Sequence, residues 1–308
     1  MVEFIMLVGL PGSGKSTYAE KLKEKGYIIH SSDAIREELT GDINSQDNNL
    51  AVFDMLHKRI KEDLKNGHSC IYDATNMSRK RRKAFLDEIS KVNCRKICVL
   101  FVIPVELCKE RNERRERKVP DEVYDRMLRA FFVPAYYEGW DEIGIVTVRR
   151  NPYPFVYESM IGFSQDNSHH SLDLFDHCFK AYKYAHEKNF PLEVQCAAKY
   201  HDCGKMYTKT FIDIKGNKTE EAHYYGHENY SAYIFLVDSF TGCDVVLNYE
   251  KGNSNKYLYI ADLINWHMRP YTSWKQSEKS LRRDKKLIGE KMYEDIMMLH
   301  EADVAAHS

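Results

Sequence analysis

The sequence predicts an α/β region over residues 1–150, in which a parallel sheet carries helices on both faces, followed by an all-α region over residues 151–308. Short apolar segments alternate with helical ones in the first half, as is typical of parallel sheets. Beyond Pro152 the periodicity is helical. Ten of the 13 histidines follow residue 150, whereas the densest lysine and arginine clusters precede it. This contrast favours phosphate chemistry in the first region and metal chemistry in the second.

In the first region, strands are expected at 3–8, 27–30, 70–72, 96–102 and 144–148. Helices are expected between them at 16–25, 34–40 and 79–91, together with a longer helix that ends at about residue 65 and a helical stretch over 111–137 that is interrupted at Pro120. The segment 151–154, with two prolines, is the expected join. Later helices are expected at 170–188, 191–203, 226–240, 257–267 and 284–306, with one hairpin at 208–220 that turns at Gly216-Asn217.

Composition excludes several classes of protein. A length of 308 residues favours two domains, and 43 % hydrophobic with 30 % charged residues excludes a disordered chain. The net charge of −1 means that nucleic-acid binding has to come from local basic patches, and the basic cluster at residues 79–83 could hold the nucleic-acid backbone. The sequence has neither a signal-peptide pattern nor an apolar run of membrane-spanning length. Eight cysteines without CxxC spacing favour reduced thiols. We expect a cytoplasmic protein without membrane contact.

A nucleotide site is predicted by a glycine-rich segment between the first strand and helix. It fits G-x-x-x-x-G-K-[ST], in which backbone N–H groups bind phosphates and the helix follows at once. Lys15 would contact the β and γ phosphates of ATP, and Ser16 would hold Mg²⁺. The nucleotide-binding residues predicted in this P-loop are Gly9, Pro11, Gly12, Ser13, Gly14, Lys15 and Ser16.

Two further carboxylates follow predicted strands. Asp33 lies where a strand passes into a helix, so it could accept a proton from an attacking hydroxyl, and Arg36, one turn on, could bind an anionic part of the acceptor. The alternative is that Asp33 only caps the helix. Asp73 follows the third strand and could position the metal's water or the acceptor. The alternative is a turn stabilised by Asp73 and Asn76.

A helix rich in arginine forms the fourth candidate element. Arg111 and Arg115 lie four residues apart and so share one face. They could close over the transferred phosphoryl group, where positive charge matters most in the transition state. Glutamates alternate with these arginines, and the alternative is therefore a solvated helix held by ion pairs.

With these motifs, residues 1 to about 148 resemble the kinase domain of polynucleotide 5′-hydroxyl kinases. The resemblance rests on the P-loop, Ser-Asp-x-x-Arg from Ser32, Asp-Ala-Thr-Asn from Asp73 and a lid motif from Arg111 to Pro120. It implies that Asp33 is the general base, that Arg36 contacts the acceptor strand, and that Arg111 and Arg115 contact nucleotide phosphates. The last three motifs also occur in some small-molecule kinases.

The second region places histidines and aspartates at helix ends. His201 and Asp202 end one predicted helix, His227 begins another and His267 ends a third. His177 and Asp303 lie within helices. A mixed set of imidazole and carboxylate groups suits divalent transition metals, although each histidine alone could be structural.

In order, these six residues resemble the H…HD…H…H…D pattern of the HD-superfamily metal phosphohydrolases, over about residues 168–308. The resemblance implies metal ligands at His177, His201, Asp202 and Asp303. It assigns His227 and His267 to a second metal or to the substrate phosphate, and Lys205 to that phosphate. One or two ions of the Mn, Ni, Co or Fe class are expected.

The leading hypothesis is a bifunctional enzyme that heals nucleic-acid ends. The first region would phosphorylate 5′-OH ends of RNA or DNA with ATP and Mg²⁺, and the second would hydrolyse 2′,3′-cyclic phosphate or 3′/2′-phosphate ends. An RNA ligase acting in the same pathway is a candidate partner. The alternatives are a nucleoside or sugar kinase fused to an HD nucleotidase, and a regulatory nucleotide sensor.

Overall fold

The computed structural model describes residues 1–43, 48–115, 117–148, 156–167, 171–240, 255–307 and, for the backbone alone, 247–250. The expected join at 151–154 therefore lies outside the described residues. By its internal contacts the chain divides into two compact units. Unit 1 comprises residues 1–127, 134–149 and 242–254, and unit 2 comprises residues 128–133, 150–241 and 255–308. The expected division at residue 150 into independent domains stays a prediction, because compactness alone does not show that a part folds by itself.

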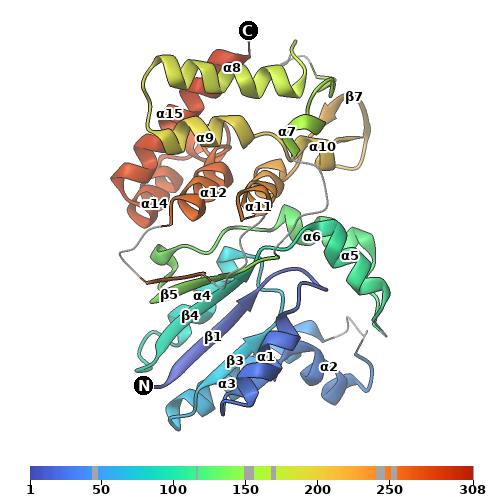
Figure 1. Ribbon diagram of the computed structural model, residues 1–308, viewed down its shortest axis with the longest axis vertical. Coiled ribbons are helices and arrows are strands. Elements are labelled where there is room, and N and C mark those ends of the chain that lie inside the picture. Colours follow the sequence, from blue (N-terminus) through green and yellow to red (C-terminus); the bar gives the residue numbers. More distant parts are fainter. Residues whose placement is uncertain are drawn as a thin grey trace. The chain divides into compact units, whose positions relative to one another are not determined.

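Unit 1 is built on a six-stranded sheet with the order β2-β3-β1-β4-β5-β8 (Figure 1). Its strands are β1 (Glu3–Val8), β2 (Ile28–Ser31), β3 (Cys70–Asp73), β4 (Arg95–Phe101), β5 (Glu142–Val146) and β8 (Leu247–Glu250). The first five run parallel, and Ile5 of the central β1 pairs with Ile71 on one side and Ile97 on the other. The β1 residues from Phe4 to Val8 are buried, as expected for a strand covered on both faces.

The sheet is not wholly parallel, which corrects the expectation from sequence. β8 lies antiparallel to β5, with Ile143 opposite Tyr249. This strand comes from a segment that periodicity assigned to the helical region. Four residues carry too little alternation to be recognised as a strand, and only the exposed edge of β5 gives them a partner.

The helices of unit 1 are α1 (Lys15–Lys23), α2 (Ser32–Thr40), α3 (Asn49–Lys65), α4 (Arg79–Glu88), α5 (Val105–Glu113) and α6 (Asp121–Arg129). The last two residues of α6 belong to unit 2, and a 3₁₀ turn, η1 (Tyr136–Glu138), belongs to unit 1. Right-handed connections between parallel strands place α1 on one face and α3 and α4 on the other. Accordingly, the Tyr18 ring of α1 packs against Phe101, whereas His57 of α3 packs against Phe85 of α4. The P-loop, Asp33 and Asp73 all follow the carboxyl ends of strands.

Unit 2 is mainly helical. Its helices are α7 (Val156–Ser159), α8 (Leu174–Glu187), α9 (Leu192–Tyr200), α10 (Lys205–Thr208), α11 (His227–Phe240), α12 (Lys256–Trp266), α13 (Ser273–Gln276), α14 (Glu278–Ile288) and α15 (Glu290–Ala306). α15 packs on α8, α9 and α12, and α11 packs on α12. The single helix expected over 284–306 is two helices, because Gly289 between them adopts a φ of 85°.

The expected hairpin is present as β6 (Thr210–Ile212) and β7 (Lys218–His223), so unit 2 is not purely α. It turns at Gly216, as the sequence predicts. None of the described helices is both long enough and apolar enough to span a membrane. The seven described cysteines are free thiols. The cytoplasmic location stays a prediction.

Candidate functional site

The P-loop follows β1 and leads into α1. Gly12 has a φ of 77°, and a Cβ there would lie 2.3 Å from the carbonyl oxygen of Cys108, so only glycine fits. Lys15 is buried, and its Nζ donates to the carbonyl of Leu10 at 2.7 Å. Burial lowers the pKa of Lys15 to about 8. A phosphate group placed beside this cation would stabilise its charge.

Ser16 and Asp73 meet beside the P-loop. The Ser16 hydroxyl donates to Oδ2 of Asp73 at 3.1 Å, and Asp73 is buried at the end of β3. Burial raises the pKa of Asp73, although Lys15 nearby opposes this shift. The pair fits Mg²⁺, which prefers oxygen ligands. Asn76, the other residue of the proposed turn, donates to the carbonyl of Leu7 at 2.9 Å and to that of Ala74 at 3.5 Å, so the turn stays the alternative for Asp73.

Asp33 does not cap its helix, because Ser31 does so by accepting from the Asp33 backbone N–H. The Asp33 side chain instead pairs with two arginines through the same oxygen. Nη1 of Arg36 lies 3.0 Å from Oδ1, and Nη1 of Arg117 contacts Oδ1 as well. The Arg36 guanidinium also donates to Asn49 at 2.9 Å. The sequence did not single out Arg117, and only tertiary structure brings it to Asp33.

The arginines of the lid motif reach the P-loop side of unit 1. Arg111 approaches the carbonyl of Gly12 at 3.5 Å, and Arg115 is close enough to Lys15 and Asp73 for its charge to act on both. Asn112 fixes the following turn through two hydrogen bonds with the backbone of Val119. α5 ends at Glu113, so Arg115 lies beyond the helix and does not share a helix face with Arg111, which corrects that expectation. Lys118, also beyond α5, forms an exposed ion pair with Glu113.

One member of the basic cluster 79–83 cannot bind a nucleic-acid backbone. Arg82 is buried and forms a two-contact ion pair with Glu138, at 2.6 and 2.8 Å. It also donates to the carbonyls of Asn76 and Met77. Its role is therefore to fix the chain after β3, which corrects the expectation for this residue.

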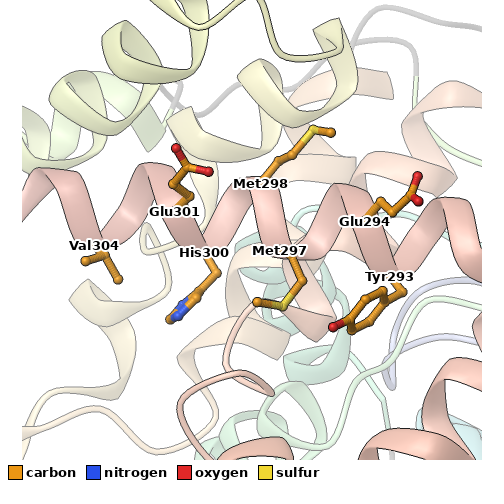
Figure 2. A pocket seen from close by; sticks show the side chains of 7 residues that line it. All are labelled: Tyr293, Glu294, Met297, Met298, His300, Glu301 and Val304. Carbon is orange, nitrogen blue, oxygen red and sulfur yellow. The ribbon is translucent and has the colours of Figure 1, made fainter.

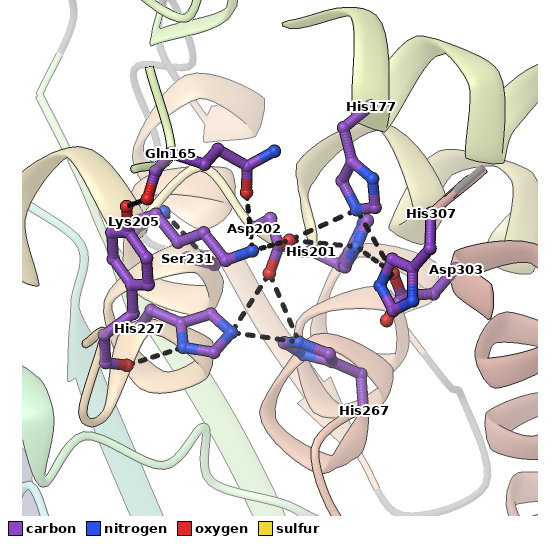
Figure 3. A network of polar contacts seen from close by, with 12 residues as sticks. Gln165, His177, His201, Asp202, Lys205, His227, Ser231, His267, Asp303 and His307 are labelled. Carbon is purple, nitrogen blue, oxygen red and sulfur yellow. Dashed lines mark hydrogen bonds and ion pairs between the residues drawn. The ribbon is translucent and has the colours of Figure 1, made fainter. Parts of the chain in front are cut away.

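Unit 2 brings the six predicted ligands together (Figure 3). His177, His227 and Asp303 lie in α8, α11 and α15, and the other three follow the ends of α9 (His201, Asp202) and α12 (His267). They form two groups, and within each group the potential ligand atoms lie within 4.8 Å of one another. All six side chains are buried. The first group is His177, His201, Asp202 and Asp303, and the second is Asp202, His227 and His267. Asp202 belongs to both, through Oδ2 in the first and Oδ1 in the second.

The histidine tautomers suit a cation. Nδ1 of His201, His227 and His267 each lies 2.7–2.9 Å from a backbone carbonyl, which makes Nδ1 the protonated nitrogen. In the neutral rings Nε2 then carries a lone pair. Yet Nε2 of His227 and Nε2 of His267 face each other at 3.2 Å. Two lone pairs at this distance repel, and a proton or a metal ion relieves the repulsion. The donor set therefore fits divalent transition metals.

The two aspartates are anions in this site. Burial alone would raise the pKa of Asp202, but Lys205, whose Nζ lies 2.7 Å from Oδ2, and the neighbouring histidines hold that pKa well below its usual range. Burial opposes ionisation of Asp303 too, and His201 and His177 overcome it to hold the pKa of Asp303 well below its usual range. Burial would lower the pKa of His201, but the two carboxylates raise it well above its usual value.

Sequence reasoning missed four residues around these groups. Gln165 accepts from Lys205 at 2.8 Å, and the Tyr271 hydroxyl donates to Oδ2 of Asp303 at 3.0 Å. His307 lies 3.3 Å from Oδ1 of Asp303. A Cβ on Gly204 would lie 2.3 Å from the carbonyl oxygen of His227, so glycine allows the close approach of the two segments. Of these four residues, only His307 had a signal in the sequence, because residues four apart on a helix, such as Asp303 and His307, lie on the same face.

Comparisons with known proteins find similarity over part of the chain. Residues 4–134 match the family described as the AAA domain. The L-seryl-tRNA(Sec) kinase of Methanococcus maripaludis is 27 % identical over 172 residues, which is 53 % of this chain and 67 % of that protein. An adenylate kinase of Thermosipho melanesiensis is 28 % identical over 139 residues, or 45 % of this chain and 55 % of that protein. This chain thus spans about half to two thirds of the length of these relatives.

Among solved structures, the Pnkp1/Rnl/Hen1 RNA repair complex contains a chain that is 22 % identical, with a TM-score of 0.38, over 41 % of this chain and 42 % of that one. A sugar kinase from Janibacter sp. HTCC2649 is 17 % identical, with a TM-score of 0.38, over 49 % of this chain and 88 % of that one. These two likenesses carry no argument about the substrate. The family match, the kinase relatives and the P-loop geometry together support a P-loop kinase fold in this part of the chain.

Proposed function

We propose that this chain is a bifunctional enzyme that heals nucleic-acid ends. Unit 1 transfers the γ-phosphate of ATP to a 5′-hydroxyl end, and unit 2 hydrolyses a 2′,3′-cyclic phosphate or a terminal 3′- or 2′-phosphate. The observation that carries the proposal is that each unit holds its own set of groups for handling phosphate. The P-loop with Asp33 serves one, and the two ligand groups that share Asp202 serve the other.

In unit 1 the residues divide the work of phosphoryl transfer. Lys15 binds the terminal phosphates, while Ser16 and Asp73 supply oxygen ligands for the Mg²⁺ that accompanies ATP. Among the described residues, both arginine contacts of Asp33 fall on Oδ1, so Oδ2 is the oxygen that accepts the proton of the attacking hydroxyl. Arg115 stabilises negative charge on the transferred group.

In unit 2 the buried histidines and aspartates hold one or two divalent ions. Bound ions of this kind activate water and neutralise charge on a phosphate. Lys205, already beside Asp202, binds a phosphate oxygen of the substrate. Gln165 orients its ammonium group, and Tyr271 orients Asp303.

An RNA acceptor is supported by the relative named L-seryl-tRNA(Sec) kinase. The products of the two reactions, a 5′-phosphate and a free 3′ end, are the ends that an RNA ligase joins, and a ligase is accordingly the partner we propose. The adenylate kinase relative favours a second candidate, a kinase of nucleosides or nucleotides.

The test is transfer of label from γ-labelled ATP to 5′-OH RNA, 5′-OH DNA, nucleosides and AMP, each at the same concentration. We expect labelling of the 5′ end of an oligonucleotide, and Lys15→Ala abolishes it because the lysine binds the transferred phosphate. Labelling confined to nucleosides or AMP would replace the proposal by the second candidate. The matched control is Lys118→Ala, since Lys118 pairs with Glu113 on the exposed face of the lid motif.

A further inference from the structure

A pocket of about 400 Å³ in unit 2 opens beside the second ligand group. His227 forms part of its wall, and Nε2 of the same residue lies 3.0 Å from Oδ1 of Asp202 (Figure 3). The pocket and the second ligand group therefore share His227. The volume lies within the range typical of small-ligand sites.

The walls of this pocket are aromatic. Phe132, Tyr224 and Tyr225 line it, together with the amide side chains of Asn229 and Asn265. Phe132 is half-buried and meets Trp266 edge-on at 5.4 Å, and Tyr225 is exposed. Flat aromatic rings at one place suit a nucleobase, which stacks on its faces.

Phe132 is held in place by its neighbours. Asn265 accepts from the Val133 N–H at 2.9 Å and donates to the Phe131 carbonyl at 3.2 Å. Asn229 donates to the Arg129 carbonyl at 2.7 Å. The backbone on both sides of Phe132 is thus fixed, so little order is lost when a ring stacks on it.

The lining of the pocket includes one cation, Arg269, and one anion, Glu228. Arg269 lines it, with its guanidinium 5.2 Å from the Trp266 ring centre and a hydrogen bond to Ser273 at 3.1 Å. A larger pocket of about 620 Å³ lies along α15 (Figure 2). Its lining includes Glu294 and Glu301, no lysine or arginine and none of the six candidate ligands. That pocket does not suit an anionic nucleotide.

We propose that the pocket beside His227 binds the base and ribose of the nucleotide whose phosphate unit 2 hydrolyses, with Phe132 as a stacking surface. The reaction in this statement rests on the proposed function, whereas the binding of a nucleoside does not. The ligand is a nucleotide with a 2′- or 3′-phosphate, either free or at the end of an oligonucleotide.

The experiment measures binding by calorimetry to the full-length, Mn²⁺-loaded protein, with the P-loop saturated by a non-hydrolysable ATP analogue. The probes are 3′-AMP, an RNA trinucleotide that ends in a 3′-phosphate, and inorganic phosphate. Phe132→Leu keeps an apolar side chain against Trp266 but removes the ring, Phe132→Trp restores a ring, and Phe179→Leu, at an exposed phenylalanine of α8, is the matched control.

We expect Phe132→Leu to weaken the binding of 3′-AMP and of the trinucleotide by about 5- to 150-fold, since stacking of one base contributes roughly 1–3 kcal/mol. Binding of inorganic phosphate stays unchanged, Phe132→Trp restores nucleotide binding, and Phe179→Leu has no effect. Tighter binding of the trinucleotide than of 3′-AMP indicates an oligonucleotide end, and equal binding indicates a free nucleotide. Both results support the pocket.

Two results would overturn the inference. Unchanged nucleotide affinity in Phe132→Leu would exclude stacking on this ring, and an equal loss for nucleotide and inorganic phosphate would indicate a general structural effect. Failure of the proposed function is a different result. In that case the wild-type protein binds 3′-AMP in a Phe132-dependent way but hydrolyses neither a 2′,3′-cyclic phosphate nor a 3′-phosphate.

Discussion

The close approach of Gly204 to α11 provides a sharp test of how the second ligand group is positioned. A Cβ at residue 204 would lie 2.3 Å from the His227 carbonyl oxygen and 2.7 Å from the Ser231 nitrogen. Ordinary contact begins near 3.4 Å, so Gly204→Ala requires a displacement of about 3.4 − 2.3 = 1.1 Å. Both obstructing atoms are backbone, so no flexible side chain can move aside.

The displacement acts on metal binding because His227 begins α11. Its Nε2 lies 3.0 Å from Oδ1 of Asp202, and a shift of about 1 Å separates the two ligand atoms. Overpacking of this kind costs about 1–3 kcal/mol of stability, partly offset by the gain of about 0.5–1 kcal/mol from replacing glycine at an ordinary φ. Disturbed positioning of metal ligands typically lowers affinity by about 10- to 100-fold.

The assay is competition for Mn²⁺ against a chromophoric chelator, combined with denaturant unfolding of the metal-free protein. Gly216→Ala in the hairpin turn is the matched control, because a Cβ there meets nothing within 4 Å and costs only backbone strain at a φ of 88°. We expect Gly204→Ala to lose both stability and affinity, and Gly216→Ala to lose stability alone. Wild-type Mn²⁺ affinity in Gly204→Ala would refute the reasoning.

Three further predictions concern single side chains. Asp33→Ala should abolish phosphoryl transfer while ATP affinity stays within a few-fold of wild type; turnover near wild type at saturating acceptor would remove Asp33 from the reaction. Arg115→Ala should lower turnover by about 10²- to 10⁴-fold in the same assay, and a loss under tenfold would favour the solvated-helix alternative. Asp238→Asn should stabilise the protein at pH 7 by up to about 2 kcal/mol, after allowance for partial exposure of the carboxyl group. Burial raises the pKa of Asp238 in the folded protein to about 6, against 3.8 for the exposed group, so the contribution of this group to wild-type stability falls as the pH rises from about 4 to 6. The amide oxygen that replaces the carboxylate can still accept from the Val156 N–H. The difference in unfolding free energy between the two proteins should therefore grow from pH 4 to pH 7, and an equal difference at both pH values would contradict this prediction.

Much of the site could be predicted because its residues are fixed by local pattern. The P-loop motif predicts its own backbone, since glycine spacing and the following helix are local features. The H…HD…H…H…D order predicted that His177, His201, Asp202 and Asp303 share a site, and their ligand atoms do lie together. Their role as metal ligands stays a prediction, as does that of Asp33 as a base.

Other features depend on tertiary contacts that no local pattern records. Arg117 contacts Asp33, which is distant in the sequence. Arg115 lies in the same arginine-rich lid motif, so the local sequence could not tell which of the two arginines pairs with Asp33. Residues 128–133 belong to unit 2 although they precede residue 150, because the backbone around Phe132 is bound by Asn229 and Asn265. Likewise, β8 is a strand only because β5 offers a free edge.

The central claim is that one chain carries two separate sites for phosphate chemistry, and one substrate tests it. An RNA oligonucleotide with a 5′-hydroxyl and a 2′,3′-cyclic phosphate reports both reactions, with ATP, Mg²⁺ and Mn²⁺ present. We predict that wild type phosphorylates the 5′ end and opens and removes the cyclic phosphate, that Lys15→Ala loses only the first reaction, and that Asp202→Ala loses only the second. Loss of both reactions in each variant, or no reaction at the cyclic phosphate by wild type, would contradict the account.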